Sequence, residues 1–107
     1  MLGVTVDELR IFEEKAMAVI DRVPESNDEE AWAILEGDLY ELFTRIRELK
    51  ERCGGEVEHW LSRASRFVLE AMRACEQAPL VVKHAVGEAA ECLNQARQAF
   101  QSPAEEP

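Results

Sequence analysis

The chain has 107 residues, of which 47% are hydrophobic, and its formal net charge at pH 7 is −10. This length and composition fit one domain with one core, and no apolar run approaches the roughly 18 residues of a membrane span. Residues 1–6 lack the basic and apolar regions of a secretory signal, which predicts a cytoplasmic protein. Because nucleic-acid phosphates repel an acidic chain, direct nucleic-acid binding is not expected.

Apolar residues recur at spacings of three and four in four segments, and residues that end helices separate these segments. Pro24, Gly54-Gly55 and Pro79 mark the three breaks. The pattern predicts an all-α antiparallel four-helix bundle with helices near 5–23, 27–53, 56–77 and 79–101. We expect residues 1–101 to form this single domain and residues 102–107 to be a flexible acidic tail.

Local signals define the ends of these helices. Thr5 with Glu8, and Ser26 with Glu29, have the spacing of capping boxes at the first two helix starts. Gly54-Gly55 is expected to supply the left-handed backbone that closes the second helix. The residues predicted to face the core are Leu9, Phe12, Ala16, Val19, Val23, Trp32, Leu35, Leu39, Leu42, Ile46, Leu49, Cys53, Val57, Trp60, Ala64, Phe67, Ala71, Cys75, Val82, Val86, Ala89, Leu93, Ala96 and Phe100, with Leu61, Val68 and Met72 widening the third apolar face.

The fourth helix is rich in small residues, which allow another helix to approach closely. These residues are Ala85, Gly87, Ala89, Ala90, Ala96 and Ala99. Either this helix is the most buried of the four, or it leaves an apolar flank for a second copy of the chain or a partner helix. Leu80 and Val81 add apolar surface near its start. Gly37 raises the same question, because a glycine inside a helix either permits close contact or is simply tolerated.

Charge is distributed unevenly along the chain. Residues 1–44 contain twelve acidic and three basic residues, a net charge of −9, whereas residues 45–107 contain ten acidic and nine basic residues, a net charge of −1. Three pairs of opposite charge lie four residues apart and are expected to form ion pairs on the helix surface. They are Glu41 and Arg45, Glu48 and Arg52, and Arg66 and Glu70. This spacing favours a solvated, paired face for Arg63, Arg66 and Arg73 rather than a phosphate-binding one.

One histidine lies in a segment with a resemblance to a signalling family. Lys83-His84-Ala85-Val86-Gly87 resembles the histidine-phosphotransfer domains, acidic four-helix bundles that carry an exposed histidine shortly before a lysine and a glycine. Here no lysine stands between His84 and Gly87, the glycine is one place too near to the histidine, and the histidine is on the last helix. The alternative is a surface histidine beside Glu88, four residues later.

The other histidine has a spacing found in an RNA-cleaving family. Arg52 and His59, with six residues between them, resemble the arginine-histidine pair of the HEPN domains, in which both residues are on one helical segment. Gly54-Gly55 interrupts that segment here. General acid-base catalysis requires both groups to converge on the scissile phosphate, and a turn between them does not fix that geometry.

Carboxylates and thiols provide the remaining chemical candidates. Glu88 and Glu91 share a helix face and resemble one acidic pair of the all-α nucleotide pyrophosphohydrolases, which hold magnesium, but a second pair is not evident because Glu36 and Asp38 point to different faces. His84 and His59 could join such a site. Cys53, Cys75 and Cys92 lack C-x-x-C spacing and fall on apolar faces, so we expect reduced thiols in the core. We predict no catalytic residue, metal or cofactor.

These patterns favour a small protein-interaction module, such as an adaptor, a chaperone-like protein or an inhibitor. Its partner is expected to be another protein with a basic surface, and a homodimer through the fourth helix stays open. The predicted contact residues are Glu29, Glu30, Glu36, Asp38, Glu41, Leu80 and Val81. The alternatives are a nucleic-acid mimic that inhibits a nuclease or defence complex, and a metal-dependent hydrolase or phosphotransfer protein.

Overall fold

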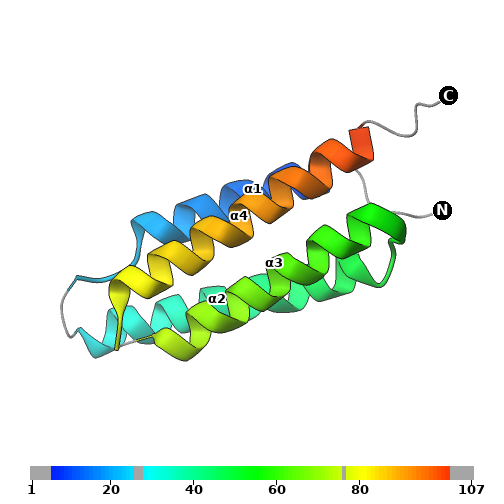
Figure 1. Cartoon of the computed structure of the whole chain (residues 1–107). Coiled ribbons are helices and arrows are strands. Elements are labelled where there is room, and N and C mark those ends of the chain that lie inside the picture. The colour runs from blue at the N-terminus through cyan, green and yellow to red at the C-terminus, as the bar shows by residue number, and fades with distance from the viewer. Residues whose placement is uncertain (1–5, 26–27, 76, 102–107) are drawn as a thin grey trace, which may run out of the picture.

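Four helices make up the fold. A computed structural model describes residues 6–25, 28–75 and 77–101, which form α1 (Val6–Asp21), α2 (Glu29–Lys50), α3 (Gly55–Ala74) and α4 (Pro79–Gln101). Successive helices run in opposite directions (Figure 1), so the predicted antiparallel four-helix bundle is confirmed. The predicted cap Thr5 and the predicted tail 102–107 lie outside the described residues.

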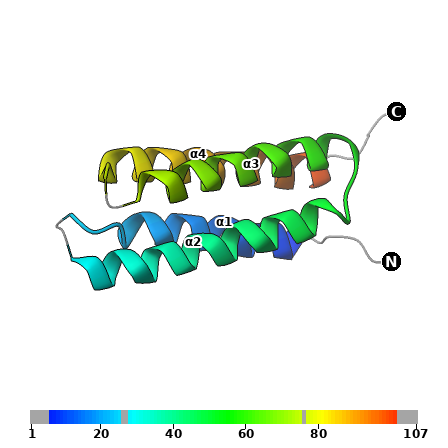
Figure 2. The ribbon, with the colours of Figure 1, turned by 90° about the horizontal axis from the view of Figure 1, so that it is seen from below.

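The helices pack around a ring in chain order. Each helix packs against its two neighbours, α4 closes the ring against α1, and within the described ranges no Cα atoms of the diagonal pairs come within 8 Å of each other. In Figure 2, α1 and α2 form one layer and α3 and α4 form the other. Short connections between antiparallel neighbours favour this arrangement. The result is a rod of 53 × 22 × 19 Å.

One core runs along the length of the rod. Trp32, Leu39 and Leu93 are 0–2% exposed, and the other buried positions repeat the predicted 3-4 spacing on all four helices. The centre of the buried face of α3 differs from the prediction. Leu61, Ser65 and Val68 lie on the inner side, whereas Trp60 and Phe67 are only half-buried. Ser65 tolerates burial because its hydroxyl donates a 2.9 Å hydrogen bond to the Ser62 carbonyl.

Several helix ends lie two or three residues inside the predicted bounds, because α1 ends at Asp21, α2 spans Glu29–Lys50 and α3 ends at Ala74. Asp28, not Ser26, caps α2, because its carboxylate accepts hydrogen bonds from the amides of Glu30 and Ala31 at 3.1 and 3.2 Å; Ser26 lies outside the described residues. The left-handed residue is Gly55 (φ +63°), the first residue of α3, whereas Gly54 is extended. α2 has already ended at Lys50, where turn hydrogen bonds replace the helical ones.

The two layers are packed to different degrees. α3 and α4 make the most extensive contact of any pair, and both bury small residues, including Ala64, Ala71, Ala85 and Ala89, that permit close approach. α4 also contains the most buried residues of the four described helices. This agrees with the first alternative given for its small residues, that it is the most buried helix. α1 and α2 make the least extensive contact. A groove remains between them.

Candidate functional site

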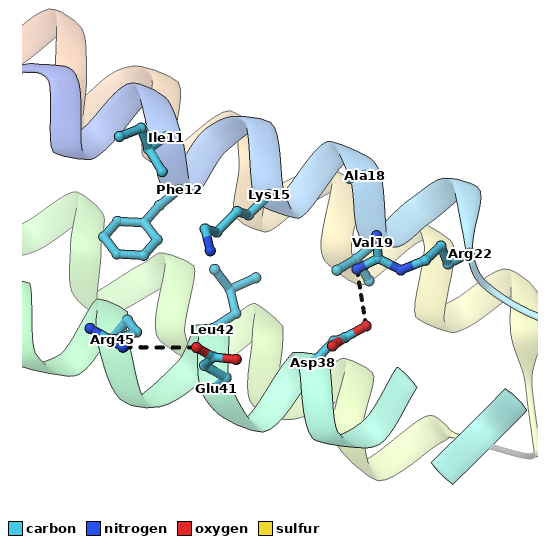
Figure 3. Close-up of a pocket in the computed structure, with 10 residues that line it drawn as sticks. All are labelled: Ile11, Phe12, Lys15, Ala18, Val19, Arg22, Asp38, Glu41, Leu42 and Arg45. Atoms are coloured by element: carbon cyan, nitrogen blue, oxygen red, sulfur yellow. Dashed lines mark hydrogen bonds and ion pairs between the residues drawn. The ribbon is translucent and has the colours of Figure 1, made fainter. Parts of the chain in front are cut away.

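The groove between α1 and α2 is a cavity of about 370 Å³ (Figure 3). On α1 its edge is formed by Ile11, Lys15, Ala18 and Arg22, which follow one another at spacings of four, three and four and therefore share a face. The other lining residues are Phe12, Val19, Asp38, Glu41, Leu42 and Arg45. The α1–α2 groove thus combines an apolar floor with a charged rim.

The charges of the α1–α2 groove largely satisfy one another. Arg22 donates a hydrogen bond from Nη2 to Asp38 Oδ2 at 3.0 Å, and Arg45 Nη2 lies 3.8 Å from Glu41 Oε2 (Figure 3). Lys15 has no ion pair within the described ranges. Two of the predicted contact residues, Asp38 and Glu41, therefore already face cations of their own chain. Their charge contributes less to the field outside the protein.

Three predicted acids remain open to solvent. Glu29, Glu30 and Glu36 are exposed, and none of them has an ion pair with another described residue. Glu29 and Glu30 occupy the first turn of α2, where carboxylates stabilise the positive end of the helix dipole. Glu36 lies beyond that turn and has no such role. Of these three carboxylates, only that of Glu36 does not stabilise the positive end of the helix dipole.

Two exposed apolar residues on α2 were not among the predicted contacts. Ile34 is 59% exposed and Tyr40 is 62% exposed, with the exposed Gly37 halfway between them. Isolated surface apolar residues are ordinary, so the sequence alone gave no reason to select these two. The structure places them beside the free acids. We call this surface the α2 outer face, and it consists of Glu29, Glu30, Ala33, Ile34, Glu36, Gly37 and Tyr40.

Spacing confirms that the α2 outer face is continuous. Positions 29, 33, 36 and 40 follow one another at intervals of four, three and four, so they line one side of the helix. A Cβ atom built on Gly37 meets nothing within 4 Å. Gly37 is therefore not needed for contact inside the bundle, and the helix backbone is accessible between the two apolar side chains.

The predicted apolar anchors lie elsewhere. Leu80 and Val81 are 78% and 50% exposed in the first turn of α4. The starts of α2 and α4 lie at the same end of the rod (Figure 1), but the two helices are diagonal in the bundle. Near this end Lys83 Nζ lies 3.7 Å from Glu25 Oε2. The seven predicted contact residues thus belong to two helices, α2 and α4, that are not neighbours in the bundle.

The two histidines lie on different helices, His59 on α3 and His84 on α4. His84 is an exposed side chain 3.9 Å from Glu88 Oε2, as the surface alternative requires. Arg52 donates to Glu8 Oε2 at 3.4 Å and does not line the cavity that contains His59. The described residues contain no group of three or more His, Cys, Asp or Glu side chains placed to hold a metal ion.

Of the three ion pairs predicted from a spacing of four residues, one forms between described residues. Glu41 and Arg45 do form an ion pair, but Arg52 contacts Glu8 instead of Glu48, and no ion pair joins Arg66 to Glu70. Arg63 lies over the Trp60 ring with its guanidinium carbon 5.5 Å from the ring centroid. The face of α3 is therefore less neutralised than its spacing suggests.

The three thiols are not disulfide-bonded, and two are shifted in acidity. Burial raises the pKa of the Cys92 thiol, and a hydrogen bond and positive charge from Arg63 oppose the rise. Burial likewise raises the pKa of Cys53, against the charge of Arg52. Both therefore remain protonated at neutral pH, which is the opposite of what a nucleophilic or metal-binding cysteine needs.

Comparison with known proteins adds no relative. No protein-family model, no curated protein and no solved structure matches the chain. Within the described residues, no helix has the length and apolar character needed to cross a membrane.

Proposed function

We propose that this protein is a small interaction module that binds a basic, amphipathic segment of another protein on the α2 outer face, without chemistry of its own. The observation that carries the proposal is the exposure of two apolar side chains beside unpaired carboxylates on α2, with Tyr40 four residues from Glu36 and Ile34 four residues from Glu30. An aromatic residue with apolar neighbours and a polar rim is the usual composition of a protein interface. We place the interaction in the cytoplasm, where the thiols stay reduced.

Charge favours a basic partner over a second copy of the chain. The free carboxylates of Glu29, Glu30 and Glu36 belong to the same outer face as the apolar residues, within a half of the chain whose net charge is −9. Two copies that met through this face would bring like charges together. A partner with lysine or arginine beside its apolar residues would instead be attracted and oriented before contact.

The proposal is tested with a defined probe, a synthetic helical peptide with one leucine face and one lysine face. We expect its binding to shift backbone amide NMR signals between Glu29 and Glu41 more than those of α3 and α4. The affinity should fall roughly tenfold when the salt concentration rises from about 50 to about 300 mM, because screening weakens interactions between exposed charges.

Matched variants locate the contact. Tyr40→Ala should weaken binding about tenfold, as for an interface aromatic residue, and Glu36→Gln should reduce its salt dependence. Met17→Ala and Glu14→Gln are the controls, because these residues are an exposed apolar side chain and an exposed acid on α1. Equal losses for control and test variants, an affinity independent of salt, or signal changes confined to α4 would refute the proposal.

A further inference from the structure

A second cavity, of about 210 Å³, lies on the outer side of α3. We call it the α3 cavity, and it is lined by His59, Ser62, Arg63, Arg66, Phe67 and Glu70. All six come from one helix, at spacings that place them on one face. The lining of the α3 cavity therefore comes from α3 alone, and it shares no residue with the α2 outer face.

Trp60 positions two of the basic side chains at this cavity. The Arg63 guanidinium lies over the indole at 5.5 Å, and the His59 ring meets the same indole edge-on, with centroids 5.2 Å apart and the planes at 70°. Trp60 itself is half-buried against the core. Arg63 also hydrogen-bonds the Cys92 thiol, and a guanidinium stacked on a ring keeps its remaining N–H groups available in its own plane. These contacts reduce the freedom of both side chains before any ligand arrives.

Arg66 supplies a second guanidinium whose charge is not used. It lines the α3 cavity and has no ion pair with any other described residue. The hydroxyl of Ser62 and the imidazole of His59 are additional donors on the same face. Glu70 is the one acid in the lining, four residues beyond Arg66 along the helix. The lining thus has an excess of donors and of positive charge.

Two arginines, a hydroxyl and an imidazole match the acceptors of a phosphate dianion. Arginine recognises phosphate through paired N–H groups, and a phosphomonoester carries a charge of about −1.5 to −2 at pH 7. Phe67 adds an apolar wall against which the rest of such a molecule can lie. We propose that the α3 cavity binds the phosphate group of a small phosphomonoester that carries an apolar or planar substituent.

The net charge of the whole protein favours a small ligand over an extended polyanion. An extended polyanion such as single-stranded DNA would contact surface beyond the α3 cavity, and the net charge of −10 repels it there. A small molecule needs only the cavity itself, and salt screens the more distant acids. The proposal concerns a small ligand and does not rest on the interaction proposed for α2.

The test uses inorganic phosphate and phenyl phosphate as probes, with the arginine side-chain Nε–H NMR signals as the readout. Both probes should shift the signals of Arg63 and Arg66 in a saturable way, and phenyl phosphate should bind more tightly because its ring contacts Phe67. Arg66→Gln should weaken binding by about tenfold or more, since a charge-assisted hydrogen-bonded contact is lost. Glu70→Gln should strengthen binding a few-fold, because a repelling carboxylate is removed.

Arg73→Gln is the matched control. It removes the same charge from an exposed position on α3, one that does not line the cavity. All of these substitutions are at the surface, so circular dichroism should show an unchanged fold. The proposal is overturned if Arg73→Gln weakens binding as much as Arg66→Gln, if neither probe saturates, or if an oligothymidylate binds more tightly than phenyl phosphate.

Discussion

The two layers of the bundle differ in packing and in charge. α3 and α4 share the most extensive contact, and residues 45–107 are nearly neutral, whereas α1 and α2 leave a groove of about 370 Å³ in the half of the chain with a net charge of −9. Packed small residues favour close contact, and self-repulsion among acids opposes it. One layer therefore provides most of the packing, while the other provides most of the exposed charge.

Core truncations should separate the two layers most clearly. Leu93 on α4 is fully buried, whereas Leu42 on α2, also buried, lines the α1–α2 groove. Leu93→Ala should lower the free energy of unfolding by about 3–5 kcal/mol, and Leu42→Ala by about 1–3 kcal/mol, because residues beside an open groove can relax into the space. Urea denaturation measures both values. Equal losses would show that the layers are packed alike.

Ion pairs should show a smaller difference in the same assay. Arg97 on α4 donates from Nε and Nη2 to Glu13 Oε1 on α1, at 3.2 and 2.9 Å, and both side chains are about three-quarters buried. The Arg22–Asp38 pair, which joins α1 to α2, is more exposed.

We expect Arg97→Gln to cost roughly 1–2 kcal/mol and Arg22→Gln less than about 0.5 kcal/mol, because solvent screens the exposed pair. A double-mutant cycle with Glu13→Gln and Asp38→Asn isolates each coupling energy. A larger coupling for the exposed pair would contradict the burial argument.

Glycine substitutions should act in the opposite direction and more weakly. Gly37 in α2 and Gly87 in α4 both have open space where a Cβ would lie. Each change to alanine should therefore stabilise the protein by up to about 1 kcal/mol through better helix propensity. Thermal unfolding measures this gain. A loss of stability at either position would mean that the glycine serves a contact inside the bundle.

The fold was predictable because its signals are local and repeated. Spacings of three and four, together with Pro24, Gly54-Gly55 and Pro79, fix four helices and most of the buried residues. The rotation of α3 was not predictable, since its apolar residues cover a wide arc and only the neighbouring helices decide which part faces inward. Trp60 and Phe67 therefore appeared to be central core residues but are half-buried.

The surfaces were predictable only in part. Sequence charge identifies α2 as acidic, but ion pairing depends on which helices become neighbours, so Asp38 was selected without its partner Arg22, sixteen residues away. The same limit hid the unpaired Arg66 of α3, whose spacing from Glu70 suggested a pair that does not form. Ile34 and Tyr40 became notable only once their position beside free carboxylates was known.

Alkaline pH should test the tighter layer through Cys92 of α4, with the smallest expected effect. Burial raises the pKa of this thiol above its ordinary value of 9.0. A raised pKa means that the folded state holds the proton more tightly than the unfolded chain does. The resulting stability is therefore fully present below the unfolded pKa and is lost as the pH rises through the folded pKa. Cys92→Ala removes this contribution.

The free energy of unfolding should consequently fall less steeply above about pH 9 in Cys92→Ala than in the native protein, by no more than about 1 kcal/mol in total. Urea titrations across the alkaline range measure the difference. Arg63→Gln provides the sharper comparison, because Arg63 holds the pKa of Cys92 down, and its loss should extend the decline to higher pH. Parallel pH profiles for all three proteins would contradict a raised pKa for this thiol, although its side chain is only 4% exposed.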